Sequence, residues 1–470
     1  MPKVPLTTGA YQARSLIANA QRCVNLYMEK NTQDSTFPTT HYPMPGLRKT
    51  GQAEGVWRGL YRASNGRVYG VCGSTAYRIS PNWMLTELGQ VMSGTGPVRM
   101  VDNGVDLLMV DGSNVGYKIV IASDVLTKVT EEGFYGGSNV QFADGFFILP
   151  RPETNQFYIS LANQSTFDPV DFALKAGSSD PLVTLSVTKR YIYLFGSLTT
   201  EVWSNQGGPE FPYSRMQGAF MEHGCAAQFS PAAIDGSVFW LSQSREGKYL
   251  ICRTESFEAV KISTFAIDGE IQGYDRVDDA IGYAMQFDGH FFYVLTFPTA
   301  QKTWVYDLST GEWNEWLSMD ENGNMLRHRG NCYAFGNGLG IVGDHTNGKL
   351  YQLDLDYALD DDMPIQRIRS FPHMVEDGNR VLYRNAIFDF QVGENRDQND
   401  TLISMRYSDT KGASWGNHLI ASIGAAGEYY RSVRFNRLGM ARDRIFEVSW
   451  SSQSRTALNG AFVEHVGARG

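Results

Sequence analysis

A short pattern recurs seven times between residues 65 and 353. Each copy begins with a turn, most often Asn-Gly or Asp-Gly. A short run of aromatic or aliphatic residues follows the turn, and a second short run, centred on Tyr, Phe or Trp, comes soon after. Two examples are Asn65-Gly66 before 67–71 and 76–79, and Asp288-Gly289 before 290–295 and 302–306. Asn-Gly and Asp-Gly between apolar runs predict tight β-hairpin turns.

The spacing of these copies strongly constrains the fold. Their turns lie at residues 66, 104, 145, 190, 236, 289 and 338, so successive copies are 38 to 53 residues apart. A repeat of roughly 40–50 residues with several strands in each unit is typical of β-propeller blades. We therefore expect an all-β protein with a β-propeller of about seven blades. Six blades plus an irregular sheet is the alternative, because the fourth and seventh copies are the weakest.

The composition agrees with a folded β protein that is rich in turns. Hydrophobic residues make up 42% of the chain and charged residues 19%, as in soluble globular proteins. The 48 glycines allow tight turns, and the 13% of aromatic residues suit half-buried pleated surfaces. A formal net charge of −9 argues against a protein held on nucleic acid by a basic surface. An acidic wall would instead let DNA slide past, because it repels phosphate.

Motifs for catalysis, cofactor binding or metal binding are absent from the sequence. It contains no Gly-x-Ser-x-Gly, no His-Glu-x-x-His and no phosphate-binding loop, and its eight histidines are scattered. The odd number and wide spacing of the cysteines predict neither a disulfide framework nor a zinc site. Cys72 and Cys252 lie in strand-like runs, so we expect buried thiols there. We expect a protein that is not an enzyme, without catalytic residues, cofactor or metal.

The sequence also predicts no insertion into a membrane. Residues 1–20 have no apolar core of the signal-peptide type. The longest apolar run, 291–295, is far shorter than the ~18 residues that a membrane span needs. We expect the chain to be made and folded in a cytoplasm.

Three regions differ in pattern. Residues 1–50 are rich in Pro, Thr and Asn and are expected to form an extended arm that packs on another element or on another chain. Residues 51–362 contain the repeated pattern and are assigned to the propeller. Residues 363–470 alternate apolar and polar positions without the repeat, and four strands are expected at 386–392, 402–407, 429–435 and 445–450. A small β-sandwich would bury their shared apolar face.

An acidic run and an arginine-rich segment lie on the two sides of this boundary. The run comprises Asp354, Asp356, Asp360, Asp361 and Asp362, and it lacks the spacing of a calcium-binding loop. A solvated linker face is the simplest interpretation. The arginine-rich segment contains Arg431, Arg434, Arg437, Arg442 and Arg444. In a ring of identical subunits the two could pair, because Arg forks bind carboxylates well; independent solvation is the alternative.

A turn in the C-terminal region resembles the Asp-box of sialidase-type propellers. Its matching residues are Ser408, Gly412, Ser414 and Trp415, whereas Thr410 occupies the Asp position and Asp409 stands one place early. The role of such a box is structural, because small polar side chains tie the turn together. A glycosidase also needs a pair of carboxylates across the scissile bond, and no local pattern places one. A carbohydrate-binding or glycoside-hydrolysing propeller is therefore the alternative function.

Several segments resemble one family, the packaged-DNA stabilisation proteins of short-tailed bacteriophages, also called tail hubs or nozzles. The similar segments are 406–415 and 434–448 near the C-terminus, 156–160, 167–169, 193–197 and 200–203 in the middle, and 25–27 and 43–46 near the start. They are structural rather than catalytic, and they touch most of the chain.

The resemblance implies a virion tail protein assembled in the host cytoplasm. Such proteins form a hexameric ring below the portal and adaptor rings, continue the DNA channel and help to retain the packaged genome. They also carry tail fibres or spikes and a terminal plug or needle. DNA would pass through the lumen without sequence-specific binding, and the family offers no catalytic residues to transfer to this chain.

Overall fold

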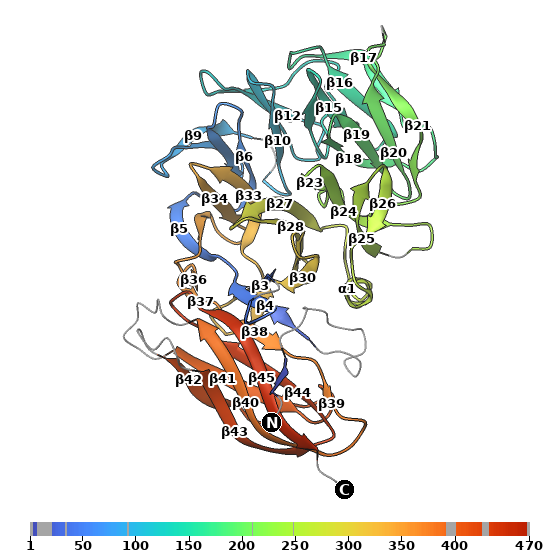
Figure 1. Cartoon of the computed structure of the whole chain (residues 1–470). Coiled ribbons are helices and arrows are strands. Elements are labelled where there is room, and N and C mark those ends of the chain that lie inside the picture. Colours follow the sequence, from blue (N-terminus) through green and yellow to red (C-terminus); the bar gives the residue numbers. More distant parts are fainter. Residues whose placement is uncertain are drawn as a thin grey trace.

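The computed structural model describes residues 3–6, 21–32, 35–91, 94–208, 210–247, 249–391, 401–424 and 432–467. The described part is almost entirely β-structure, with one short helix, α1 (Phe265–Ile271). A propeller occupies one end of the molecule and a β-sandwich, orange to red in Figure 1, the other. Both predicted architectures are confirmed.

Six of the blades are built in chain order from antiparallel strands. The first three blades are β6 (Trp57–Arg62), β7 (Val68–Cys72), β8 (Thr75–Ile79) and β9 (Leu85–Gln90); β10 (Arg99–Asp102), β11 (Asp106–Val110), β12 (Gly116–Val120) and β13 (Val125–Lys128); and β14 (Gln141–Ala143), β15 (Phe146–Pro150), β16 (Gln156–Ser160) and β17 (Phe167–Leu174).

The fourth to sixth blades continue the same pattern, and the fifth has an extra inner strand. They are β18 (Leu182–Thr188), β19 (Tyr191–Gly196), β20 (Thr200–Asn205) and β21 (Tyr213–Met221); β22 (Gly224–Cys225), β23 (Ala232–Ile234), β24 (Ser237–Gln243), β25 (Tyr249–Glu255) and β26 (Glu258–Lys261); and β27 (Ile281–Phe287), β28 (His290–Phe297), β29 (Lys302–Asp307) and β30 (Glu312–Glu315).

The seventh blade combines both ends of the propeller sequence. Its strands are β33 (Gly330–Gly336), β34 (Leu339–Asp344), β35 (Lys349–Asp354) and, from the N-terminal region, β5 (Gly46–Gln52). Strand β5 pairs antiparallel with β35, with Leu47 opposite Leu353. This contact closes the ring, so the propeller has seven blades, and the six-bladed alternative is wrong.

Each copy of the sequence pattern corresponds to one place in a blade. The turn joins the first and second strands, and the two apolar runs are the second and third strands. The turn residues have the positive φ values that two-residue hairpins require, for example +52° at Asp144 and +90° at Gly145. The middle strands are apolar on both faces because each blade is stacked between two others. In β19, Ile192 and Leu194 enter one core, whereas Tyr193 and Phe195 enter the next.

Seven such cores separate successive blades around the ring. An eighth core fills the sandwich and contains Ile403, Phe446 and Trp450. One sandwich sheet contains β40 (Val381–Gln391), β43 (Ser432–Ala441) and β45 (Ala457–Gly467), and the other contains β38 (Arg367–Ser370), β44 (Asp443–Trp450), β41 (Thr401–Ser408) and β42 (Leu419–Gly424), with β39 (Met374–Val375) beside β44. Strands β38, β39, β42 and β45 were not predicted from the sequence.

The described part of the N-terminal region packs on other elements of the same chain and connects the two domains. Strands β3 (Leu26–Lys30) and β4 (Thr39–Pro43) form a hairpin on the sandwich sheet next to β45, and β1 (Lys3–Pro5) pairs with β45 as well. Strand β2 (Cys23–Val24) lies between β30 of the sixth blade and β38 of the sandwich, so one continuous sheet runs through both domains. Strands β3 and β4, in blue, lie at the junction in Figure 1.

The expected divisions at residues 51 and 363 therefore differ from the strand pairing. Residues 46–50, assigned to the arm, belong to the seventh blade. The second division falls inside a small hairpin, β36 (Leu359–Asp360) with β37 (Met363–Pro364), which pairs with β5. One further hairpin, β31 (Leu317–Met319) with β32 (Met325–Arg327), lies between the sixth and seventh blades.

Candidate functional site

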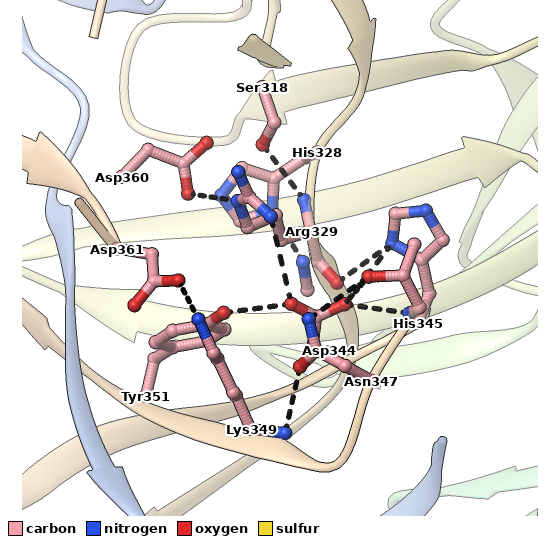
Figure 2. Close-up of polar contacts among 12 residues, drawn as sticks. Ser318, His328, Arg329, Asp344, His345, Asn347, Lys349, Tyr351, Asp360 and Asp361 are labelled. Atoms are coloured by element: carbon pink, nitrogen blue, oxygen red, sulfur yellow. Dashed lines mark hydrogen bonds and ion pairs between the residues drawn. The ribbon is translucent and has the colours of Figure 1, made fainter. Parts of the chain in front are cut away.

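A buried polar network lies where β5 closes the seventh blade, and Figure 2 shows its contacts. Asp344, at the end of β34, is fully buried. Its carboxylate accepts hydrogen bonds from Tyr351 Oη at 2.8 Å and from the amide and hydroxyl of Thr346, both at 2.7 Å. Arg329 Nη1 lies 3.9 Å from Asp344 Oδ2. These contacts hold the turn between β34 and β35 against the rest of the blade.

Two aspartates extend the network to the hairpin β36–β37. Asp360 Oδ1 accepts from Arg329 Nε at 2.9 Å, and Asp361 forms an ion pair with Lys349. The Asp361 amide also donates to the Leu47 carbonyl at 3.0 Å. We call Arg329, Asp344, Lys349, Tyr351, Asp360 and Asp361 the closure network. It clamps β5 between β35 and the following hairpin.

The interpretation of the acidic run as a solvated linker is therefore wrong for two of its five residues, Asp360 and Asp361. Asp360 is 1% exposed and Asp361 7% exposed, because both pair with cations of the seventh blade. Asp354 accepts from Arg48 Nε at 2.8 Å across the β35–β5 pair. Asp356 and Asp362 are exposed. Asp360 and Asp361 are thus unavailable to a neighbouring subunit.

Burial is the largest cause of the shifted pKa values of Asp360, His328 and His345 in this region. It raises the pKa of the Asp360 carboxyl to about 6, although Arg329 opposes the shift. Burial also lowers the pKa of His328 to about 3 and that of His345 to about 4. His328 Nδ1 accepts the Gly330 amide at 3.1 Å, which requires an unprotonated nitrogen at that position. Both histidines are therefore neutral in the folded protein at neutral pH.

Acid should destabilise the propeller between pH 6.5 and pH 5. His328 and His345 have folded-state pKa values below the ordinary 6.5, so the unfolded chain binds protons that the folded chain does not. The contribution of the two neutral histidines to the free energy of unfolding is complete above pH 6.5. Between pH 6.5 and pH 5 each histidine loses roughly 1.5 kcal/mol of this contribution. The raised pKa of Asp360 stabilises the folded chain as the pH falls, but one carboxyl offsets only part of the stability that two histidines lose.

Urea unfolding at both pH values measures this effect. His328→Gln should reduce the loss of stability on acidification, whereas His418→Gln, at an exposed position, should leave it unchanged. An identical pH dependence in the wild type and His328→Gln would contradict the assignment.

The arginine-rich segment separates into exposed and buried members. Arg434, Arg437 and Arg442 are exposed on β43 and the turn after it, whereas Arg431 lies outside the described residues. Arg442 Nη1 donates to the Gly378 carbonyl at 2.8 Å. The exposed arginines are free to meet another chain.

Arg444 is buried, so its assignment to a subunit interface is wrong. It is 1% exposed, and its Nε and Nη2 donate to the two carboxylate oxygens of Asp409 at 2.6 and 2.7 Å. Its guanidinium also lies over the Tyr407 ring, 4.0 Å from the centroid. A bidentate pair of this kind ties the turn after β41 to β44.

The Asp-box-like turn is formed without its expected aspartate. Ser408 Oγ accepts from the amide of Gly412 at 2.9 Å, and Thr410 Oγ1 accepts from the amide of Ser414 at 2.8 Å. The Thr410 hydroxyl thus performs the role of the missing carboxylate, which leaves Asp409 for Arg444. The Arg406 guanidinium lies 4.7 Å from the half-buried Trp415 ring. All these contacts are structural.

A cavity of about 390 Å³ lies at the centre of the propeller. Strands β6, β10, β23, β27 and β33 contribute most of its wall, and β14 and β18 complete it, so every blade supplies its innermost strand. The sequence analysis missed this site. The inner strands are shorter and less apolar than the repeated runs, and only ring closure brings them together. Arg99, a cation in this wall, is not part of any recognisable sequence motif.

Other sequence expectations have simpler outcomes. All five cysteines are free and buried, which confirms the expectation for Cys72 and Cys252. Within the described ranges, no group of three or more His, Cys, Asp or Glu side chains is placed to hold a metal ion. Helix α1 is too short to cross a bilayer. No other helix among the described residues is long and apolar enough to do so.

Two family models match this chain. The model described as "Bacteriophage P22 Gp10, beta-propeller" matches residues 2–358, and the one described as "Bacteriophage P22 Gp10, beta-sandwich" matches residues 366–466. No curated protein matched the sequence. Among solved structures, the WD40 β-propeller domain of Doa1 is similar at 12% identity and a TM-score of 0.40, covering 66% of this chain and 96% of that one. The WD40 repeats of RRP9 give 10% identity and a TM-score of 0.43, with 67% and 99% covered.

Proposed function

This chain belongs to the bacteriophage P22 Gp10 family of structural phage proteins that stabilise packaged DNA, and we propose that it forms a ring in the virion tail around the path of the DNA. The observation that carries the proposal is the pair of family matches, which cover the propeller and the sandwich in order. Retention of the genome is then a mechanical task for the assembled ring, and the chain acts as a component of its wall.

The architecture suits a rigid wall segment. Seven inter-blade cores and the closure network lock the propeller, and the sheet that runs through β30, β2 and β38 couples it to the sandwich. Side chains packed at the density of protein interiors transmit load with little deformation. A subunit of this kind can hold its shape against the pressure of packaged DNA while its loops contact other proteins.

The DNA path in this proposal lies between subunits and not through a single propeller. The central cavity of about 390 Å³ has the volume of a small-molecule site. It is too small for a DNA duplex, whose major groove alone is about 12 Å wide. A ring of several copies provides the wider lumen. The net charge of −9 would favour passage of DNA without adhesion.

The partners in this proposal are those of a tail hub. Six copies form the ring, an adaptor ring lies on the side of the capsid, and tail fibres or spikes and a plug or needle attach on the other sides. The chain itself would not enter a membrane. Long loops, such as the connection between β20 and β21 within the fourth blade, offer surfaces for such contacts.

Particle imaging tests the proposal directly. Mass photometry of the purified protein, together with electron microscopy of virions, should show a ring, with six copies in the assembled tail. A protein that is absent from purified virions would refute the proposal. Release of sugar from a fluorogenic sialoside by the purified protein would favour the carbohydrate-active alternative.

The exposed arginines of β43 and of the turn after it are the proposed ring contacts. The double variant Arg437→Glu/Arg442→Glu should weaken ring assembly at least tenfold, because it reverses two charges that can meet carboxylates of the neighbouring subunit. Mass photometry across a concentration series measures the change. The matched control is Arg62→Glu/Arg245→Glu, which reverses two exposed arginines on the propeller. Equal assembly of the two double variants would exclude this contact.

A further inference from the structure

The wall of the central cavity has a charge opposite to that of the whole chain. The residues that line it include two arginines, Arg58 and Arg99, and no aspartate or glutamate. The net charge of the chain is −9. A positively charged cavity enclosed by an acidic protein concentrates small anions.

Arg58 is committed to the protein itself. It is 3% exposed, and its guanidinium donates to the carbonyls of Gly96 at 2.6 Å and Gly73 at 3.1 Å. It also forms an ion pair with Asp111 at 3.2 Å. Its charge is therefore balanced, and it holds the connection between the first two blades.

Arg99 differs because no carboxylate among the described residues balances it. Its Nη2 donates to the carbonyls of Phe229 at 2.5 Å and Gly282 at 3.1 Å, which aligns the guanidinium across the cavity wall. Among the described residues, Nε has no hydrogen-bond partner, and Arg99 forms no ion pair. Burial lowers the pKa of Arg99 to about 10, so it remains charged at neutral pH. Arg99 is half-buried, and a cation that is partly removed from water without a nearby carboxylate is unfavourable unless an anion accompanies it.

The neighbouring wall supplies both space and further polar groups. Gly59 and Gly282 lie along the cavity, and a side chain at either position would meet backbone oxygen at 2.4 and 2.0 Å respectively. Tyr283 and Asn331 belong to the same wall; their Oη and Oδ1 atoms have no partner among the described residues, but both atoms are covered by protein. Apolar contacts come from Leu60, Met100 and Ala284. A few fixed polar groups within a partly apolar cavity are the usual features of a small-ligand site.

We propose that the central cavity binds a small organic anion, with a carboxylate or phosphate head on Arg99 and an apolar body against the inner strands. A guanidinium fork that already has two donors fixed by backbone carbonyls can present its remaining donors to an oxyanion. The cavity volume matches a ligand of a few rings at most. This site is independent of the proposed ring and does not involve DNA.

Ligand-observed NMR and thermal shift with three matched fragments test the site. Phenyl phosphate and benzoate carry the two possible heads, and benzamide is the neutral counterpart. We expect one or both anions to bind at millimolar concentration and benzamide to bind at least tenfold more weakly. The comparison between phosphate and carboxylate identifies the preferred head. Equal binding of benzamide, or no binding of either anion, would overturn the proposal.

Variants then locate the binding. Arg99→Met should lose at least tenfold in affinity, whereas Arg62→Met, which removes an exposed arginine of the first blade, should bind as the wild type does. Ala233→Phe places a ring at an exposed position of the wall, and it should block binding without removing any donor, so the test remains valid if Arg99→Met does not fold. Unchanged binding in Ala233→Phe, or in a folded Arg99→Met, would exclude the cavity as the site.

Discussion

Replacing Leu47 with aspartate should open the propeller at its seventh blade and lower the free energy of unfolding by about 5 kcal/mol. Leu47 is fully buried in the core between the sixth and seventh blades. Its strand, β5, pairs with β35 on one side and with β36 on the other. An aspartate there removes apolar packing and introduces a carboxylate without a cation. The loss is comparable with the whole stability of a typical domain.

Urea unfolding followed by Trp fluorescence measures this loss, and hydrogen exchange of the β35 amides reports the opening itself. The matched control is Lys49→Asp, which introduces the same residue at an exposed position of the same strand. Surface substitutions of this kind usually change stability by less than ~0.5 kcal/mol. An unfolding midpoint of Leu47→Asp equal to that of the control would show that β5 does not hold the ring closed.

Replacing Lys175 with methionine should cost about 3–5 kcal/mol, because it leaves a buried carboxylate without its cation. Lys175 is completely buried, and its Nζ lies 2.6 Å from Asp180 Oδ1 and 2.9 Å from Thr199 Oγ1. The amides of Leu198 and Thr199 donate to the other oxygen of Asp180. Burial alone would raise the pKa of Asp180, but Lys175 and these amides together hold it well below the ordinary value. The pair joins the outer strand of the third blade to the fourth.

The pH dependence separates lost charge pairing from lost packing. In the wild type the stabilisation from Asp180 is complete above pH 3.8 and is lost only as the pH falls below that value. In Lys175→Met the unpaired Asp180 should have a raised pKa, so the variant should recover part of its deficit between pH 7 and pH 4. The double variant Lys175→Met/Asp180→Asn should recover stability at pH 7 as well.

Lys189→Met, at an exposed position of the fourth blade, is the control for Lys175→Met. Thermal and urea unfolding at pH 7 and pH 4 measure all four proteins. A deficit of Lys175→Met that is the same at both pH values would indicate packing alone and exclude the buried ion pair as its cause.

Local patterns in the sequence were sufficient to predict the blades. The turn at Asp144 and Gly145 depends on two residues, and the alternation through Ile192 and Tyr193 depends on neighbouring positions in one strand. Both signals recur along the propeller, which favoured seven blades, but only the pairing of β5 with β35 excluded six. The family resemblance rests on similar local segments, and the family matches confirm it.

The candidate sites were harder to predict because their partners are distant in the chain. Strand β5 is polar at most positions, and its pairing with β35 joins residues about 300 positions apart, as at Thr50 and Leu350. The acidic run appeared solvated for the same reason, since Arg329 and Lys349 meet Asp360 and Asp361 only after the ring has closed.

The sequence by itself determined the repeated hairpins and the family resemblance, because hairpin turns and side-chain alternation are decided by residues close together in the chain. The tertiary structure alone decided that β5 completes the seventh blade, that Asp360, Asp361 and Arg444 are buried, and that Arg99 lines a cavity. These features depend on where the last blade meets the first segment. That contact is made only when the whole ring packs, and the burial it creates changes how each charged residue behaves.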